Sequence, residues 1–148
     1  MDALELLKQD HQKVKKLLTS ATETEDKNEQ KRLFREIKSE LETHARLEET
    51  IFYPAVQEYK ELKNMVFESL EEHRQVKTLL RDLSRATAGS DKFKAKLKVL
   101  RDDVEHHAEE EEEGKMFPKV RKTFNGKELE ELGQQLEAAK QKRLRRAS

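Results

Sequence analysis

The chain has 148 residues, of which 31 are basic and 31 acidic, so its formal net charge is zero. This balance gives no overall field to attract nucleic acid or an anionic membrane, and the length suits one domain with its own core. The absence of cysteine excludes disulfides, thiolate metal sites and iron–sulfur clusters. With four Gly, two Pro and no alternating strand pattern, the sequence predicts an all-α protein.

The first predicted helix runs from about residue 3 to about residue 21. Its apolar positions recur every three or four residues, and one position in this buried seam is a histidine. The seam consists of Leu4, Leu7, His11, Val14 and Leu18. The polar stretch 22–28 is a predicted loop, in which Asp26 can cap the next helix.

The second predicted helix begins near Lys27 and reaches the region of Pro54, which should kink it. His44 and Glu48 lie four residues apart, so both side chains project from one helix face, which is otherwise apolar. Burying such groups unpaired would cost several kcal/mol. We therefore expect them either to meet other polar groups in the core or to hold a metal. Tyr53 is predicted to pack at the boundary of the core.

The third and fourth predicted helices repeat this pattern on either side of a turn at residues 87–90. His73 lies in the middle of the third seam, and the fourth seam ends with His107 and Glu111. Ser90 is the predicted N-cap of the fourth helix. His106 falls outside the seam and is predicted either to be a boundary residue or to contact a ligand residue from outside. The acidic run 109–113 is predicted to be a solvated face with one member turned inward.

A fifth, shorter helix is predicted after Asn125, with Glu128 completing a capping box. Its apolar residues predict that it packs on the outside, and the basic run 140–146 reads as a solvated helix end. We therefore divide the chain into residues 1–124, made of two helix-pair repeats over about 1–60 and 61–124, and a C-terminal helix with a basic tail over 125–148.

Four histidines on four helices are the main functional signal. His44 follows His11 by 33 residues and His107 follows His73 by 34, which indicates an internal duplication of one helix pair. Antiparallel packing would bring these side chains and their carboxylates to one level. Imidazole and carboxylate ligands suit iron, zinc or manganese, and six residues are too many for one tetrahedral zinc. The candidate ligands of two metals are His11, His44, Glu48, His73, His107 and Glu111.

These motifs resemble the hemerythrin-like, or HHE cation-binding, family over roughly residues 1 to 124. The residues that carry the resemblance are Asp10-His11, His44-x-x-x-Glu48-Glu49 with Phe52-Tyr-Pro54, Glu72-His73, and His107-x-x-x-Glu111 with Met-Phe-Pro118. The resemblance implies an up-down-up-down antiparallel four-helix bundle with a non-haem di-iron centre, its two irons bridged by an oxo or hydroxo group. It also implies that the six candidates are the ligands, with zinc or manganese as substitutes for iron.

Two departures from the family pattern affect the site. Oxygen-carrying hemerythrins have a fifth ligand histidine at the position that Lys77 occupies here. The second repeat also has an extra residue, because His107 to Pro118 spans 11 positions while His44 to Pro54 spans 10. Counting back from the proline would make Glu112 the counterpart of Glu48, with the extra residue absorbed as a π-bulge. We predict Glu111 as the ligand and keep Glu112 as the alternative.

The leading functional hypothesis is a di-iron protein that binds or reacts with oxygen, nitric oxide or peroxide for sensing, storage or detoxification. The alternative is an enzyme that degrades peroxide or oxidises a substrate at the same centre, with catalase-like or peroxidase-like activity. A ferritin-like oxidase would carry Glu-x-x-His twice, which this sequence does not. A purely structural helical adaptor leaves the histidines unexplained. We expect a cytoplasmic monomer or weak homodimer whose partner is a small ligand, without nucleic acid or membrane.

Overall fold

The computed structural model describes residues 1–147 and the side chains of residues 1–146, so Ser148 of the predicted tail lies outside the described residues. All regular structure in the described part is helical, which confirms the all-α class. None of the described helices is long and apolar enough to cross a membrane. The elements are α1 (Ala3–Glu23), α2 (Lys27–Leu47), the π-helix η1 (Glu48–Phe52), α3 (Tyr53–Val56), α4 (Lys60–Arg85), α5 (Asp91–Glu105), the π-helix η2 (His106–Met116), α6 (Phe117–Thr123) and α7 (Gly126–Ala147).

Side-chain caps begin several helices where the sequence places polar residues. Asp26 accepts from the backbone N–H groups at the start of α2, and Ser90 accepts from the N–H of Phe93 in α5, as predicted. Asn125 and Glu128 form the predicted reciprocal capping box before α7, at 2.8 and 2.9 Å. These bonds satisfy N–H groups that have no partner within the helix.

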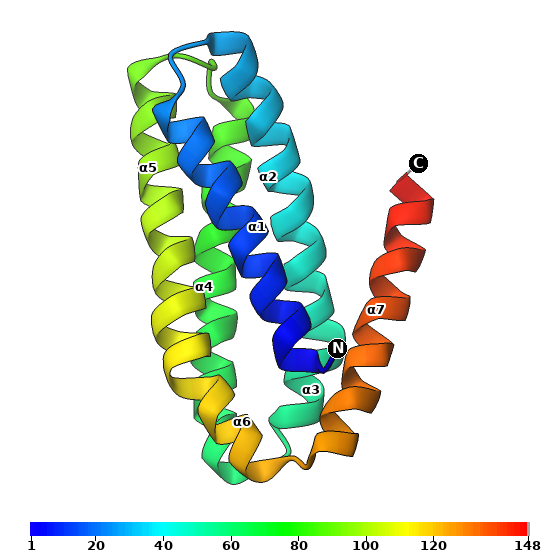
Figure 1. Ribbon diagram of the computed structural model, residues 1–148. Coiled ribbons are helices and arrows are strands. Elements are labelled where there is room, and N and C mark those ends of the chain that lie inside the picture. Colours follow the sequence, from blue (N-terminus) through cyan, green and yellow to red (C-terminus); the bar gives the residue numbers. More distant parts are fainter. Residues whose placement is uncertain (148) are drawn as a thin grey trace.

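The helices α1, α2, α4 and α5 pack side by side, and α7 lies outside them against α1 and α2 (Figure 1). At 22 residues α7 is as long as the main helices, so the prediction of a short fifth helix was wrong. The basic run prolongs it, because Lys140 and Arg143 bond Asp10 of α1 and Thr43 of α2. The close approach of α7 needs Gly133, where a Cβ atom would lie 2.5 Å from the carbonyl oxygen of Met1.

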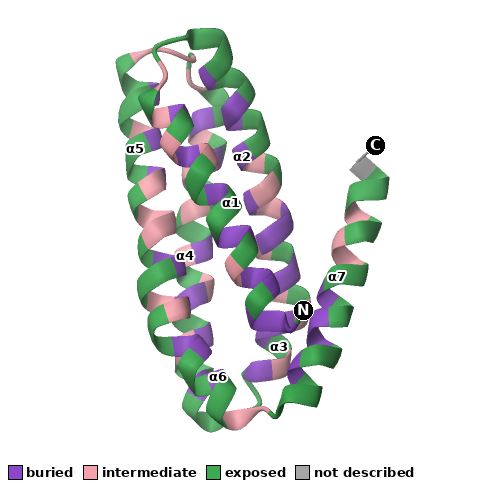
Figure 2. Ribbon diagram, viewed as in Figure 1, coloured by how far each residue is buried: buried purple, intermediate pink, exposed green. Residues whose placement is uncertain are grey.

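The apolar core is divided into two clusters. One gathers the N-terminal half of α1, η1, α3, α6 and the apolar face of α7, and the other fills the space between the opposite ends of α1, α2, α4 and α5. Buried residues, purple in Figure 2, line the inner faces of these helices. Along α1, Leu7 belongs to the first cluster and Val14 to the second, with His11 between them. The buried histidines therefore lie in a polar layer between two apolar ones.

Two π-helices interrupt the helical path at this polar layer, one in each repeat. The N–H of Tyr53 bonds the carbonyl of Glu48, and the N–H of Phe117 bonds the carbonyl of Glu112, five residues back in both cases. A proline then occupies the first turn of the α-helix that follows, where an N–H has no helical partner to lose. In both repeats, therefore, the buried glutamate lies in a π-helix.

Candidate metal centre

The central cluster consists of six buried side chains that meet between the two apolar cores. Its members are His11, His44, Glu48, His73, His107 and Glu112. They form two groups in which all potential ligand atoms lie within 4.8 Å of one another: His11, His44, Glu48 and Glu112, and Glu48 with His73 and His107. We call His11 and His44 the first half of the cluster, and His73 and His107 the second half.

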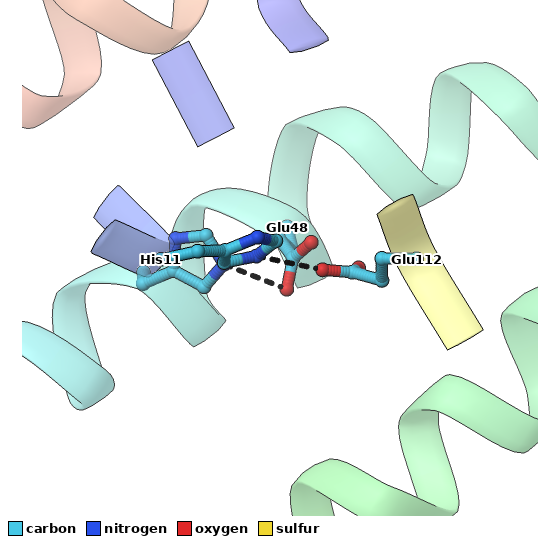
Figure 3. Close-up of side chains that lie close together, drawn as sticks. His11, Glu48 and Glu112 are labelled. Carbon is cyan, nitrogen blue, oxygen red and sulfur yellow. Dashed lines mark hydrogen bonds and ion pairs between the residues drawn. The ribbon is translucent and has the colours of Figure 1, made fainter. Parts of the chain in front are cut away.

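Each glutamate of the central cluster faces one histidine of each half. Glu48 Oε1 lies 3.2 Å from His44 Nε2 and 3.1 Å from His73 Nε2. Glu112 Oε1 lies 3.0 Å from His11 Nε2, toward which it points in Figure 3, while its Oε2 lies 3.6 Å from His107 Nε2. Both carboxylates therefore lie between the halves, as carboxylates that bridge two metals do.

A second ring of carboxylates orients the histidines from outside. Each histidine uses its Nδ1–H to donate to an acidic side chain from a neighbouring helix, which leaves Nε2 facing the centre. The pairs are His11 with Glu113 at 2.6 Å, His44 with Asp10 at 3.0 Å, His73 with Glu49 at 2.7 Å and His107 with Glu72 at 2.6 Å. Metal-binding histidines are commonly oriented this way, because the outer bond fixes the tautomer and the ring direction.

Glu111 lies outside the central cluster, so its predicted placement was wrong. Its carboxylate accepts from Lys115 at 3.2 Å, whereas the side chain of Glu112 is fully buried between the histidines. The reason is η2, because residues five apart lie over one another in a π-helix and Glu112 is five residues after His107. Counting back six residues from Pro118 also gives Glu112, as counting back from Pro54 gives Glu48.

Tyr53 belongs to the site, although the sequence predicted it at the boundary of the core. Its hydroxyl donates to Glu112 Oε2 at 2.5 Å and lies 3.3 Å from His73 Nε2. The signal for it is the five-residue spacing from Glu48, which is meaningful once η1 is a π-helix. His106, by contrast, is half exposed, as a boundary residue should be.

Comparisons with known proteins agree with this geometry. A sequence model of the hemerythrin HHE cation binding domain matches residues 2–120. The chain belongs to the hemerythrin HHE cation-binding family. Its structure superposes with a TM-score of 0.84 on the crystal structure of a hemerythrin HHE cation binding domain-containing protein, the Rv2633c homolog from Mycobacterium kansasii, at 30% identity, covering 96% of this chain and 86% of that one.

Two curated relatives are also similar to this chain. Rv2633c from Mycobacterium tuberculosis is 31% identical over 139 residues, which is 93% of this chain and 84% of the relative. A protein named DNA nickase from a Nostoc species is 27% identical over 142 residues, or 96% of this chain. The HHE chain described here spans 40% of the length of that relative.

The residues of this HHE domain fit a bound metal. Among the described side chains, two buried polar atoms make no hydrogen bond, His44 Nε2 and Glu48 Oε2, and both belong to the central cluster; His44 Nε2 has only the ion pair with Glu48 Oε1 at 3.2 Å. Leaving a buried donor or acceptor unsatisfied costs about 1–3 kcal/mol each, so these atoms need another partner. An imidazole nitrogen and a carboxylate oxygen are ligands that iron, zinc and manganese accept.

In the absence of metal, the buried carboxylates raise the pKa values of the histidines that face them. Burial alone would lower the pKa of His44, but the charge of Glu48 and the hydrogen bond to Asp10 outweigh it and raise that pKa to about 10. Burial also works to lower the pKa of His11, His73 and His107, but hydrogen bonds to glutamates and the charges of those glutamates outweigh it and raise the pKa of each. Burial works to raise the pKa of Glu48, yet the His44 charge and several hydrogen bonds bring it well below its usual range. A metal ion would replace these protons as the positive charge of the layer.

A small cavity of about 50 Å³ adjoins the central cluster on one side. All four histidines line it, together with apolar side chains that include Val14, Leu41, Val76, Leu80 and Val104. Lys77, which stands where a fifth histidine would be in oxygen carriers, also lines it, with its ammonium bonded to Glu49 at 2.8 Å. The histidine edges thus face a largely apolar space.

Proposed function

We propose that this HHE domain holds two iron ions in the central cluster and binds or reacts with oxygen, nitric oxide or peroxide. The observation that carries the proposal is the apolar cavity of about 50 Å³ against all four histidines. A single water needs roughly 10–15 Å³ of such space, so a cavity of about 50 Å³ holds a molecule of a few heavy atoms and is too small for a bulky substrate. Its apolar lining favours an uncharged ligand.

The residues of this chain divide between two metals. His11 and His44 would hold one ion and His73 and His107 the other, with Glu48 and Glu112 between them. When bound, iron would supply the redox change and the open coordination position for the ligand, and zinc or manganese could substitute for it structurally. The packing of α1, α2, α4 and α5 supports the up-down-up-down four-helix bundle that this family membership suggests.

A second candidate is an enzyme that turns over peroxide at the same centre, and Tyr53 favours it. Its hydroxyl is buried beside the second half of the cluster and can donate a proton through the bond to Glu112. A positioned proton donor is what general acid catalysis of peroxide cleavage would use. We do not extend DNA nicking to this chain, because it spans 40% of the relative that carries that name.

The cavity provides the test. Val76→Phe should fill the space beside the histidines without removing a ligand, so the iron content per chain should stay at the wild-type value in elemental analysis. The change in visible absorption on adding nitric oxide or peroxide to the iron-loaded protein should then be lost or strongly slowed. Val99→Phe is the matched control, because Val99 is 49% exposed and lies outside the cavity.

Unchanged ligand reactions in a Val76→Phe variant with full iron content would rule out the cavity as the ligand site. A wild-type chain that takes up no iron under anaerobic reconstitution would rule out the di-iron proposal itself.

A further inference from the structure

A second group of metal-ligating side chains lies beside the central cluster, nearer the surface. We call Glu72 of α4 with His106 and Glu111 of η2 the outer site. His106 Nε2 lies 3.5 Å from Glu72 Oε2 and 3.5 Å from Glu111 Oε1, and one ligand atom from each residue lies within 4.8 Å of the others. The carboxylates are largely buried, with side chains 18% and 13% exposed, while the His106 side chain is 48% exposed. Solvent therefore reaches a preorganised set of three ligand atoms.

The two ring nitrogens of His106 divide their partners as those of the four central histidines do, although its Nδ1 partner Glu110 lies on the same helix and is 69% exposed. Its Nδ1 donates to Glu110 at 2.8 Å, and this leaves Nε2 facing the two carboxylates of the outer site. In the central cluster the same division places every Nδ1 on an outer carboxylate and every Nε2 toward the centre. The arrangement of a metal-binding histidine is thus present a fifth time, one residue before His107.

The two repeats differ in what covers this position. In the first repeat, Asp10 holds His44 with Oδ2, and its Oδ1 accepts from the ammonium of Lys140 at 2.7 Å. In the second repeat, Glu72 holds His107 with Oε1, and its Oε2 faces His106 instead. A cation of α7 therefore stands on the outer oxygen in the first repeat, and an imidazole with a further carboxylate faces the equivalent oxygen in the second.

The two repeats also differ at the residue that precedes the second cluster histidine of each repeat. Thr43, which precedes His44, accepts from Arg143 of α7 at 2.9 Å, whereas His106, which precedes His107, faces Glu72 and Glu111. The ammonium of Lys115 lies 3.2 Å from Glu111 of the outer site, and because its side chain is 60% exposed it can move aside. The surroundings of the outer site are negatively charged. Burial raises the pKa of the neighbouring Asp103, and the charges of Asp102 and Glu72 raise it further, while His106 lowers it.

We propose that Glu72, His106 and Glu111 form a third site for a divalent transition-metal ion, which passes the ion to the central cluster. One imidazole and two carboxylates suit Fe²⁺, Mn²⁺ or Zn²⁺ better than Ca²⁺ or Mg²⁺. Three protein ligands leave other positions to water, so the ion can depart. Glu72 connects the two sites, because its other oxygen holds His107 at 2.6 Å. The transfer step rests on the proposed function, whereas the site itself does not.

Counting bound metal tests the site. The metal-free full chain is dialysed against buffered Zn²⁺ and analysed for zinc per chain. Wild type should bind three ions, with His106→Ala and Glu111→Gln binding two. Glu71→Gln is the matched control, because Glu71 is an exposed acid beside Glu72 and pairs with Arg74, so this variant should keep three.

A wild-type stoichiometry of two, or three ions in His106→Ala, would overturn the outer site. Glu112→Gln separates this result from a failure of the proposed function, since it should lose metal from the central cluster and keep the ion at the outer site. A Glu112→Gln chain with wild-type metal content would count against the central assignment alone.

Loading kinetics test the transfer. On mixing the metal-free chain with Fe²⁺ under anaerobic conditions, wild type should fill the central cluster several-fold faster than His106→Ala, with the same final iron in that cluster. Quenching with a chelator at intervals and measuring retained iron gives both rates. Equal rates in the two chains would overturn the loading role.

Discussion

At the scale of single residues, the two halves of the central cluster differ most at Tyr53 and Phe117. Both residues precede a proline and follow a cluster glutamate by five positions. Phe117 stacks on His11, with ring centroids 6.1 Å apart, while Tyr53 presents a hydroxyl to Glu112 and His73. One half therefore has an apolar wall and the other a hydrogen-bond donor. We expect the two metals to differ in reactivity for this reason.

Removing that donor should separate metal binding from chemistry. Tyr53→Phe leaves all six cluster residues in place, so the two irons of the central cluster should remain bound. Peroxide consumption by the iron-loaded protein should fall by about a hundredfold, the lower range for loss of a positioned proton donor. Tyr59→Phe is the control, because Tyr59 packs against Phe124 away from the cluster. Undiminished peroxide consumption in Tyr53→Phe would assign Tyr53 to packing alone.

The choice between two adjacent glutamates gives a second residue-scale prediction. Glu112→Gln replaces a carboxylate that lies between both halves with a neutral amide. The affinity of the central cluster for iron should therefore fall at least tenfold. Glu111→Gln removes a side chain that pairs with Lys115 and should leave the central iron in place. Elemental analysis after dialysis against a weak chelator distinguishes them. Loss of central iron from Glu111→Gln alone would restore the ligand assignment drawn from the α-helical spacing.

At the scale of elements, η1 and η2 explain which parts of the site could be predicted from sequence. His11, His44, His73 and His107 follow the 3.6-residue period of ordinary α-helices, so their convergence was predictable. Glu112 and Tyr53 depend on π-turns, whose five-residue spacing an α-helical pattern does not contain. The equal distance from Glu48 and Glu112 to the following prolines was the available signal.

The length of α7 was missed for a different reason. The predicted helix was judged by its leucines, and a charged run carries no apolar period that would extend it. In the structure Lys140 reaches Asp10, and Arg143 reaches Thr43, so contacts with other helices hold the basic segment in place. Such long-range pairs cannot be read from local spacing. The same helix thereby supports the carboxylate that orients His44.

Gly133 tests how closely α7 must approach the N-terminus. Gly133→Ala would place a methyl group 2.5 Å from the carbonyl oxygen of Met1, and backbone atoms there cannot move as a side chain could. We expect a loss of about 1–3 kcal/mol in the free energy of unfolding, measured by urea titration. Gly126→Ala is the matched control, because its Cβ would meet nothing within 4 Å, and it should be neutral or slightly stabilising. Equal stability of the two variants would contradict the close contact.

At the scale of the whole molecule, a charged layer separates two apolar cores, so we expect folding and metal binding to be coupled. The cores lie on either side of the buried histidines and carboxylates. The pKa of His44 is raised to about 10, so in the metal-free chain this imidazole would carry a proton at neutral pH, and in the loaded chain a metal would take that proton's place. The stability of the metal-free chain should therefore depend on pH far more than the stability of the metal-loaded chain.

We predict that the metal-free chain loses stability as pH rises from neutral. The folded pKa of His44 is raised from 6.5 to about 10, since the Glu48 charge and the Asp10 hydrogen bond outweigh burial. A group with a raised folded pKa stabilises fully below its unfolded pKa, and this contribution is lost as pH rises through the folded one. The loss between about pH 6.5 and pH 10 should amount to a few kcal/mol, on the order of 1.4 kcal/mol per unit of pKa. Thermal unfolding of metal-free and iron-loaded protein across this range should give midpoints that diverge with rising pH, because the loaded histidines have no proton at Nε2 to lose. Parallel curves would show that the histidines of the metal-free cluster are neutral.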